Sequence, residues 1–167
     1  MRSEDLKITA LDGMFAVEVS GRANFDYAVP LRALAEKLTP DTQLQIDLGN
    51  CEAMDSTFMG VLTMLALKLR KNGHQVMLVG AGENLLKLLQ DLGVAKLFNC
   101  VSESASGDGE AVEPAASGDM LTTAETVAEA HRALAGANPE NAEKFKAVIE
   151  FADQDVERLK KSREQGE

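Results

Sequence analysis

The feature that most limits the fold of this chain is the alternation of strand-like and helix-like apolar patterns along residues 6–101. Helical patterns, with apolar residues three and four positions apart, occupy 27–38, 56–71 and 83–91. Short apolar or alternating runs, typical of strands, occupy 6–11, 14–19, 44–48, 75–79 and 96–101. This order predicts an α/β fold with one mixed, mostly parallel sheet of about five strands and helices packed on it.

Turn and capping residues lie at the boundaries between these predicted strands and helices. Asp12-Gly13 separates the first two strand-like runs and indicates a tight hairpin, which makes the edge of the sheet antiparallel. Asn24 or Asp26 can cap the helix that follows. We expect residues 49–54 to form a loop that leads from the third strand into the helix at 56–71.

The composition changes after residue 101. Residues 102–119 contain no Lys or Arg and almost no large apolar side chain, which predicts a flexible acidic linker or extended loop. Two helical patterns follow, at 120–135 and 140–161, and Asn138-Pro139 is a typical start for the second. We therefore expect three parts, namely a domain at 1–101, a linker at 102–119 and a two-helix C-terminal extension at 120–163. The apolar stripe of the last helix must pack within the chain, in a homodimer or on another protein.

Charge and composition exclude several classes of function. The chain has a net charge of −10, concentrated after residue 101, and no basic stripe, so we expect it to bind neither nucleic acid nor an anionic membrane. No apolar run is long enough to span a membrane, and the N-terminus lacks the pattern of a secretory signal, so we expect a cytoplasmic protein. Cys51 and Cys100 are too few and too far apart for a disulfide framework or a zinc site.

No set of residues indicates catalysis. We expect His74 to be a turn or surface residue and His131 a partly buried helix residue, because neither pairs with a nucleophile in the predicted order. Asp47 and Asp55 are better explained as a strand residue and a helix cap than as a catalytic pair. The segment 80–82, Gly-Ala-Gly, lacks the rest of a nucleotide motif, so a tight turn is favoured over a small-molecule groove. We expect no enzyme activity, no cofactor and no metal.

Asp55-Ser56-Thr57 lies where an apolar strand and a short loop lead into a helix, and it allows two interpretations. In the first, Asp55 and Ser56 only accept hydrogen bonds from free N–H groups of the first helical turn. In the second, Ser56 is a phosphoacceptor, because a phosphate would meet the positive end of the helix dipole and would change the charge of the surface. The residues alone allow both interpretations and favour the helix cap.

Residues 6–101 resemble a STAS domain, the family of bacterial anti-sigma-factor antagonists and of the cytosolic tails of sulphate transporters. The family motif is an Asp, a phosphorylatable Ser and a second hydroxyl residue, followed by Gly-Leu-Gly. Asp55, Ser56, Thr57 and Gly60 match it, whereas Phe58 replaces a small residue and Met59 also departs. The resemblance rests on an ordered set of segments, namely Gly21-Arg22, 44–48, 54–62, 73–80 and 92–98.

The resemblance implies a non-catalytic binding protein of a bacterial signalling pathway that regulates transcription. Such antagonists bind an anti-sigma factor that is also a serine/threonine kinase. Phosphorylation breaks the complex, and a phosphatase resets it. Here Ser56 would be the acceptor and Thr57 a second candidate, with Asn24, Asp55 and Phe58 completing a partner-binding surface with them. The alternative is a phosphorylation-independent scaffold or oligomerisation module that acts through the C-terminal helices.

Overall fold

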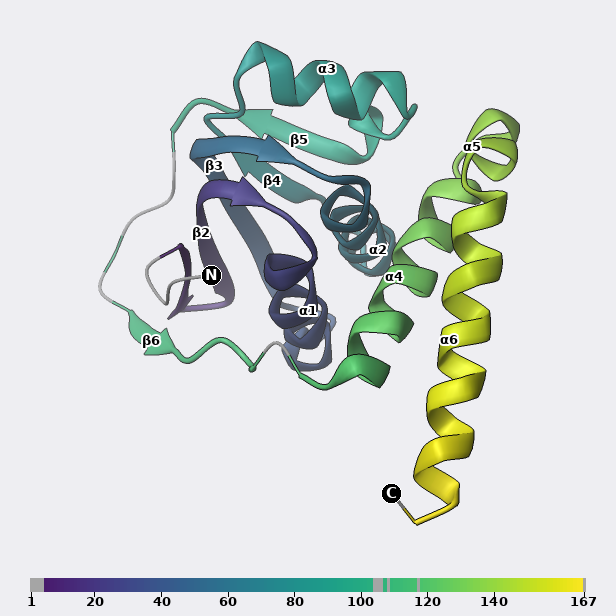
Figure 1. The fold of residues 1–167 in the computed structure, drawn as a ribbon. Coiled ribbons are helices and arrows are strands. Elements are labelled where there is room, and N and C mark those ends of the chain that lie inside the picture. The colour runs from purple at the N-terminus through teal and green to yellow at the C-terminus, as the bar shows by residue number, and fades with distance from the viewer. Residues whose placement is uncertain (1–4, 104–106, 108, 117, 167) are drawn as a thin grey trace.

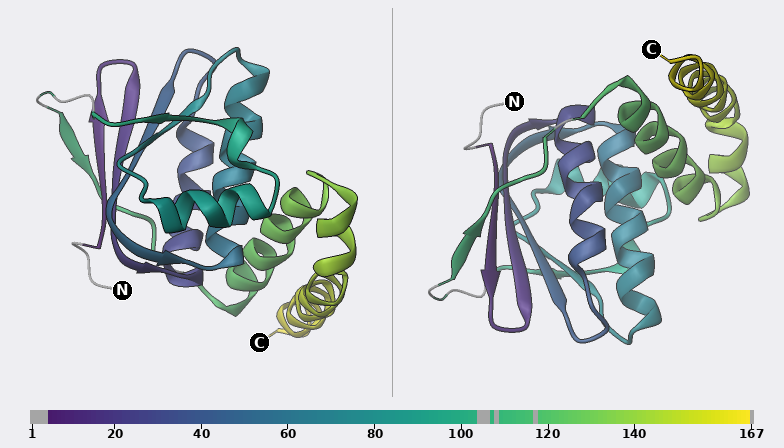
Figure 2. Two further views of the ribbon diagram at one scale, coloured as in Figure 1. Left: turned by 90° about the horizontal axis from the view of Figure 1, so that it is seen from above. Right: turned by 90° about the horizontal axis from the view of Figure 1, so that it is seen from below.

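The protein is described by a computed structural model that covers residues 5–103, 107, 109–116 and 118–166. A six-stranded sheet in the order β5-β4-β3-β2-β1-β6 forms one layer. Figure 2 shows α1, α2 and α4 on one side of this sheet. The strands are β1 (Leu6–Leu11), β2 (Met14–Ala23), β3 (Gln43–Met54), β4 (Val76–Val79), β5 (Phe98–Val101) and β6 (Glu110–Val112). The helices are α1 (Phe25–Leu34), η1 (Ala35–Lys37), α2 (Ser56–Lys71), α3 (Glu83–Asp91), η2 (Ala95–Leu97), α4 (Met120–Ala135), α5 (Pro139–Lys144) and α6 (Lys146–Glu164).

The sheet confirms the predicted mixture of strand directions. β2, β3, β4 and β5 pair in parallel, because each successive pair is joined through a helix. β1 pairs antiparallel with β2 across the predicted turn, where Gly13 has a φ of 71° that glycine adopts without a steric clash. The predicted fold class is therefore confirmed, with six strands in place of about five.

Two segments expected to be loops contribute strands. The segment 49–54 belongs to β3 and pairs with β2 beyond a register shift. Within the predicted linker, β6 pairs antiparallel with residues 8–10 of β1, so this part of 102–119 is a sheet edge and not a free linker. A side chain at Gly109 would lie 2.4 Å from the carbonyl oxygen of Ala10, so the close approach of β6 requires glycine there.

The helices confirm most of the predicted boundaries. α2, α3 and α4 begin and end where the apolar periodicity does. The predicted helix at 140–161 is instead two helices, because the backbone at Phe145 (φ −102°, ψ 7°) leaves the helical conformation between α5 and α6. No helix of the described residues is long and apolar enough to cross a lipid bilayer.

We call α4, α5 and α6 the C-terminal arm (Figure 1). The arm joins the hydrophobic core through Ala130 and Leu134 of α4 and through Phe145, all of which are buried. Asn141 of α5 donates from its side-chain amide to the carbonyl oxygens of Leu92, at 2.7 Å, and of Leu134, at 2.9 Å. The arm is therefore attached to the same core as the sheet.

α6 lies on the outer side of α4 (Figure 1). Two ion pairs join the two helices, Asp119 with Arg163 and Arg132 with Asp153. The side chains of these pairs are largely exposed, so each pair contributes little to stability. Ala152 packs on α4, but most of α6 faces away from the domain.

Candidate functional site

Asp55 ends the extended chain after β3 and caps α2. Its Oδ1 accepts a hydrogen bond from the backbone N–H of Phe58 at 2.8 Å, and its own N–H donates to the carbonyl of Ala23 at 3.0 Å. Burial raises the pKa of the Asp55 carboxyl above its ordinary value, although the Phe58 N–H and the nearby His131 oppose the shift. The predicted capping role follows directly from this geometry.

Ser56 is the first residue of α2, and its side chain contacts the C-terminal arm. Ser56 Oγ lies 2.8 Å from Nε2 of His131, and His131 Nδ1 lies 2.7 Å from the carbonyl oxygen of Val127. A carbonyl oxygen only accepts, so Nδ1 carries a proton. In the tautomer with this single ring proton, Nε2 is an acceptor and the Ser56 hydroxyl donates to it.

His131 has almost no freedom to move away from Ser56. Its side chain is buried, with 2% exposed, and its ring packs edge-on against the ring of Phe145, with centroids 5.1 Å apart. Sequence analysis placed His131 on a partly buried helix face but did not connect it with Ser56. The two residues are 75 positions apart, and the only local signal was a histidine on the apolar stripe of 120–135.

Gly60 lets α4 approach this end of α2. A side chain at Gly60 would lie 2.3 Å from the carbonyl oxygen of Ala130, and Ala130 is fully buried. Because the obstacle is backbone, the contact tolerates no side chain without movement of a whole helix. Ion pairing between Arg32 of α1 and Glu129 of α4 holds the same stretch of α4 from the other side.

The other predicted site residues divide between surface and core. Asn24 is exposed, and its side chain caps α1 by accepting from the N–H of Asp26 at 2.9 Å. Thr57 is 7% exposed, and Phe58 is fully buried with its ring edge-on to that of Tyr27. The prediction that Phe58 contacts a partner is corrected, because a side chain with no exposed area belongs to the core. The structure brings Asn24, Asp55 and Ser56 to one end of the domain.

The residues weighed for other chemistry lie apart from this site. His74 Nε2 is 3.1 Å from the carbonyl oxygen of Pro40, on an exposed turn. Asp47 Oδ1 accepts from the N–H of Gly49 at 2.8 Å, on the interior strand β3 near Gly80. Cys51 and Cys100 carry free thiols, and burial raises the pKa of each. Within the part of the chain that the structure describes, no three metal-binding side chains gather.

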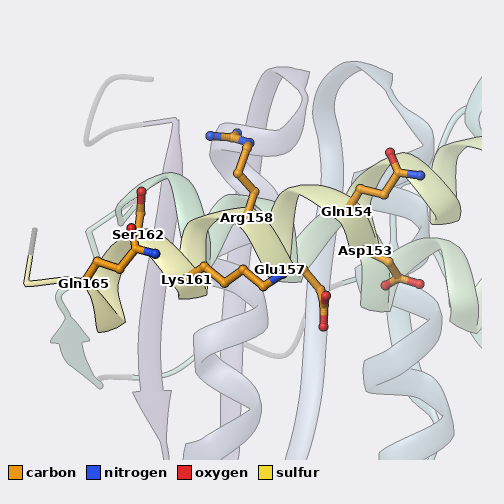
Figure 3. A pocket seen from close by; sticks show the side chains of 7 residues that line it. All are labelled: Asp153, Gln154, Glu157, Arg158, Lys161, Ser162 and Gln165. Carbon is orange, nitrogen blue, oxygen red and sulfur yellow. The ribbon is translucent and has the colours of Figure 1, made fainter.

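Among the described residues, the two most prominent hollows of the surface are not lined by Ser56. A shallow one of about 600 Å³ is lined by side chains of α6 alone, and Figure 3 shows them pointing to different sides of that helix. A site for a small molecule needs facing walls, which one helix does not supply. A second hollow, of about 460 Å³, lies between α1, α4 and α6 and is bordered by the exposed side chains of Phe25 and Met120.

The raised pKa of Asp55 predicts how the unfolding free energy changes with pH. Because the folded state raises this pKa, Asp55 favours folding in acid, and that contribution is lost as the pH rises through the raised value. Asp55→Asn keeps a capping oxygen but does not titrate. We expect the difference in unfolding free energy between wild type and Asp55→Asn to fall with pH in this acid range and then level off. Urea denaturation at a series of pH values measures it, and a constant difference would contradict the assignment.

Comparison with known proteins shows which family the domain is similar to. Residues 8–99 match the family model described as "Mlab, STAS domain". Among solved structures, the anti-sigma factor antagonist SpoIIAA in its unphosphorylated form is similar, with a TM-score of 0.49, 11% identity, and coverage of 59% of this chain and 89% of that one. A candidate anti-sigma factor antagonist from Thermotoga maritima gives a TM-score of 0.50, 14% identity, and coverage of 57% and 84%. No curated protein sequence matches this chain. The residues that the family model matches, 8–99, end before the C-terminal arm begins at Met120.

Proposed function

The chain belongs to the STAS domain family, and from this premise we propose that it is a non-catalytic regulatory protein of the anti-sigma-factor antagonist type. Its partner is an anti-sigma factor that is also a serine/threonine kinase, and the two proteins meet in the bacterial cytoplasm. Binding requires an unphosphorylated Ser56. The kinase phosphorylates Ser56 and releases the protein, and a phosphatase restores the binding form.

The position of Ser56 supports this proposal most directly. Its hydroxyl stands on the first turn of α2, where the positive end of the helix dipole favours a phosphate. The modification would add nearly two negative charges beside Asp55. Thr57 is more deeply buried than Ser56, so Ser56 is the acceptor that we propose. The partner surface comprises Asn24, Asp55 and Ser56.

We expect protein purified from its native cell to carry one phosphoryl group on Ser56. Intact mass before and after phosphatase treatment measures it, and the matched variants Ser56→Ala and Thr57→Ala locate it. Ser56→Ala should abolish the mass shift, and Thr57→Ala should keep it. If phosphatase never changes the mass, or if only Thr57→Ala abolishes the shift, the proposed switch is wrong.

The alternative function is a scaffold or oligomerisation module that acts through the arm. Val148 and Phe151 favour it, because they are 37% and 68% exposed on α6 and give the helix an apolar patch that a second copy can cover. Ser56→Asp distinguishes the two functions. Recovery of co-purifying kinase from native cells should collapse under the proposed switch, whereas a scaffold would keep its partners and its oligomeric state.

A further inference from the structure

The contact between the domain and its C-terminal arm uses a proton that Ser56 itself supplies. His131 Nδ1 donates to Val127, and in the tautomer with this single ring proton Nε2 offers a lone pair to Ser56 Oγ at 2.8 Å. The hydrogen bond therefore exists only while Oγ carries its hydrogen. Esterification of Ser56 removes that hydrogen and leaves two lone pairs facing each other, one on half-buried Ser56 and one on buried His131.

We propose that the arm senses the chemical state of Ser56, so that phosphorylation of Ser56 releases α4 from the first turns of α2. The choice of phosphate as the modification rests on the proposed function. In this step the Oγ–H bond breaks and an Oγ–P bond forms. The phosphoryl group comes from a nucleoside triphosphate, which leaves as the diphosphate, and the proton passes to solvent.

Charge and packing both favour release. The phosphate brings negative charge next to the Asp55 carboxylate, which caps the same helix. Arg32, the cation that pairs with this stretch of α4, is already bound to Glu129. The ring of His131 cannot retreat on its own, because Phe145 and the Val127 carbonyl hold it. The strain is therefore transmitted to α4 as a whole.

Movement of α4 would change a surface that Ser56 does not reach. The hollow between α1, α4 and α6 takes its walls from both the domain and the arm, with Phe25 on one side and Met120 on the other. If α4 shifts, the side chains of Phe25 and Met120 separate, and the hollow between α1, α4 and α6 is lost. A half-buried serine can thus control binding over a wider area than its own.

The test uses the full chain with phosphoserine installed at position 56 during translation, followed by hydrogen–deuterium exchange. We expect protection of α4 and α6 amides to fall about tenfold or more, while that of β3 and β4 is unchanged. Phosphoserine at Ser102, an exposed residue outside the site, is the matched control and should leave the arm protected. Ser56→Ala, which removes the donor without adding charge, should give a smaller loss.

Unchanged or increased protection of α4 would overturn the proposal. NMR evidence that His131 gains a second proton and binds the phosphate would also overturn it, because the phosphate would then hold α4 on α2. The result does not depend on whether the native cell phosphorylates Ser56, since the phosphate is installed during synthesis. Failure here is therefore distinguishable from failure of the proposed function, which the mass of the native protein decides.

Discussion

Gly60→Val should separate α4 from α2 and lower the unfolding free energy by about 3 kcal/mol. The first side-chain carbon would lie 2.3 Å from the Ala130 carbonyl oxygen, which belongs to the backbone and cannot turn aside. α4 would have to retreat, and Ala130, Leu134 and the Ser56–His131 hydrogen bond would lose their contacts together. Urea denaturation measures the loss, and hydrogen exchange shows whether the arm opens first.

Gly82→Val is the matched control for this substitution. Gly82 caps α3 with a φ of −72°, which any residue adopts, and no atom lies within 4 Å of the position of its missing side chain. We expect a change of less than about 1 kcal/mol there. Equal stability of the two variants would mean that α4 does not pack on Gly60 as closely as described.

Phe58→Ala should lower the unfolding free energy by about 3–5 kcal/mol, the usual cost of emptying an aromatic site in a core. Phe58 is fully buried between the sheet and its helices, and it packs edge-on against Tyr27 with ring centroids 6.4 Å apart. Tyr27 is the only tyrosine, and the chain has no tryptophan, so Tyr27 fluorescence reports unfolding at this position.

Phe25→Ala provides the comparison, because the same side chain is removed from a site that is 45% exposed. We expect a loss of about 1 kcal/mol or less. If Phe58→Ala cost no more than Phe25→Ala, Phe58 would not be a core residue, and its original assignment to a partner surface would return.

The parts of the fold that the sequence predicted are those that local periodicity determines. α2, α3 and α4 repeat their apolar residues along one face, and β1 and β2 alternate around the turn at Gly13. The missed parts depend on a partner strand. β6 has little apolar character and becomes a strand only because β1 offers it an unpaired edge, and the second half of β3 likewise follows β2.

The candidate site divides in the same way. The cap at Asp55 involves residues three positions apart, so helix-capping rules predicted it. The link from Ser56 to His131 crosses into the arm, beyond the residues that resemble the family, and no local rule connects them. Phe58 illustrates a different limit, since a motif position gives no information about which side chain faces outward.

The short strand β6 also affects how separate molecules meet. An open sheet edge attracts strands of other chains, and long, flat edges are where fibrous aggregates begin. In this protein β6 lies along residues 8–10 of β1 and occupies that edge with a segment rich in acidic residues. At the opposite edge, β5 is only four residues long. The short β6 therefore leaves fewer unpaired backbone groups for the strands of other molecules than residues 8–10 of β1 would leave without it.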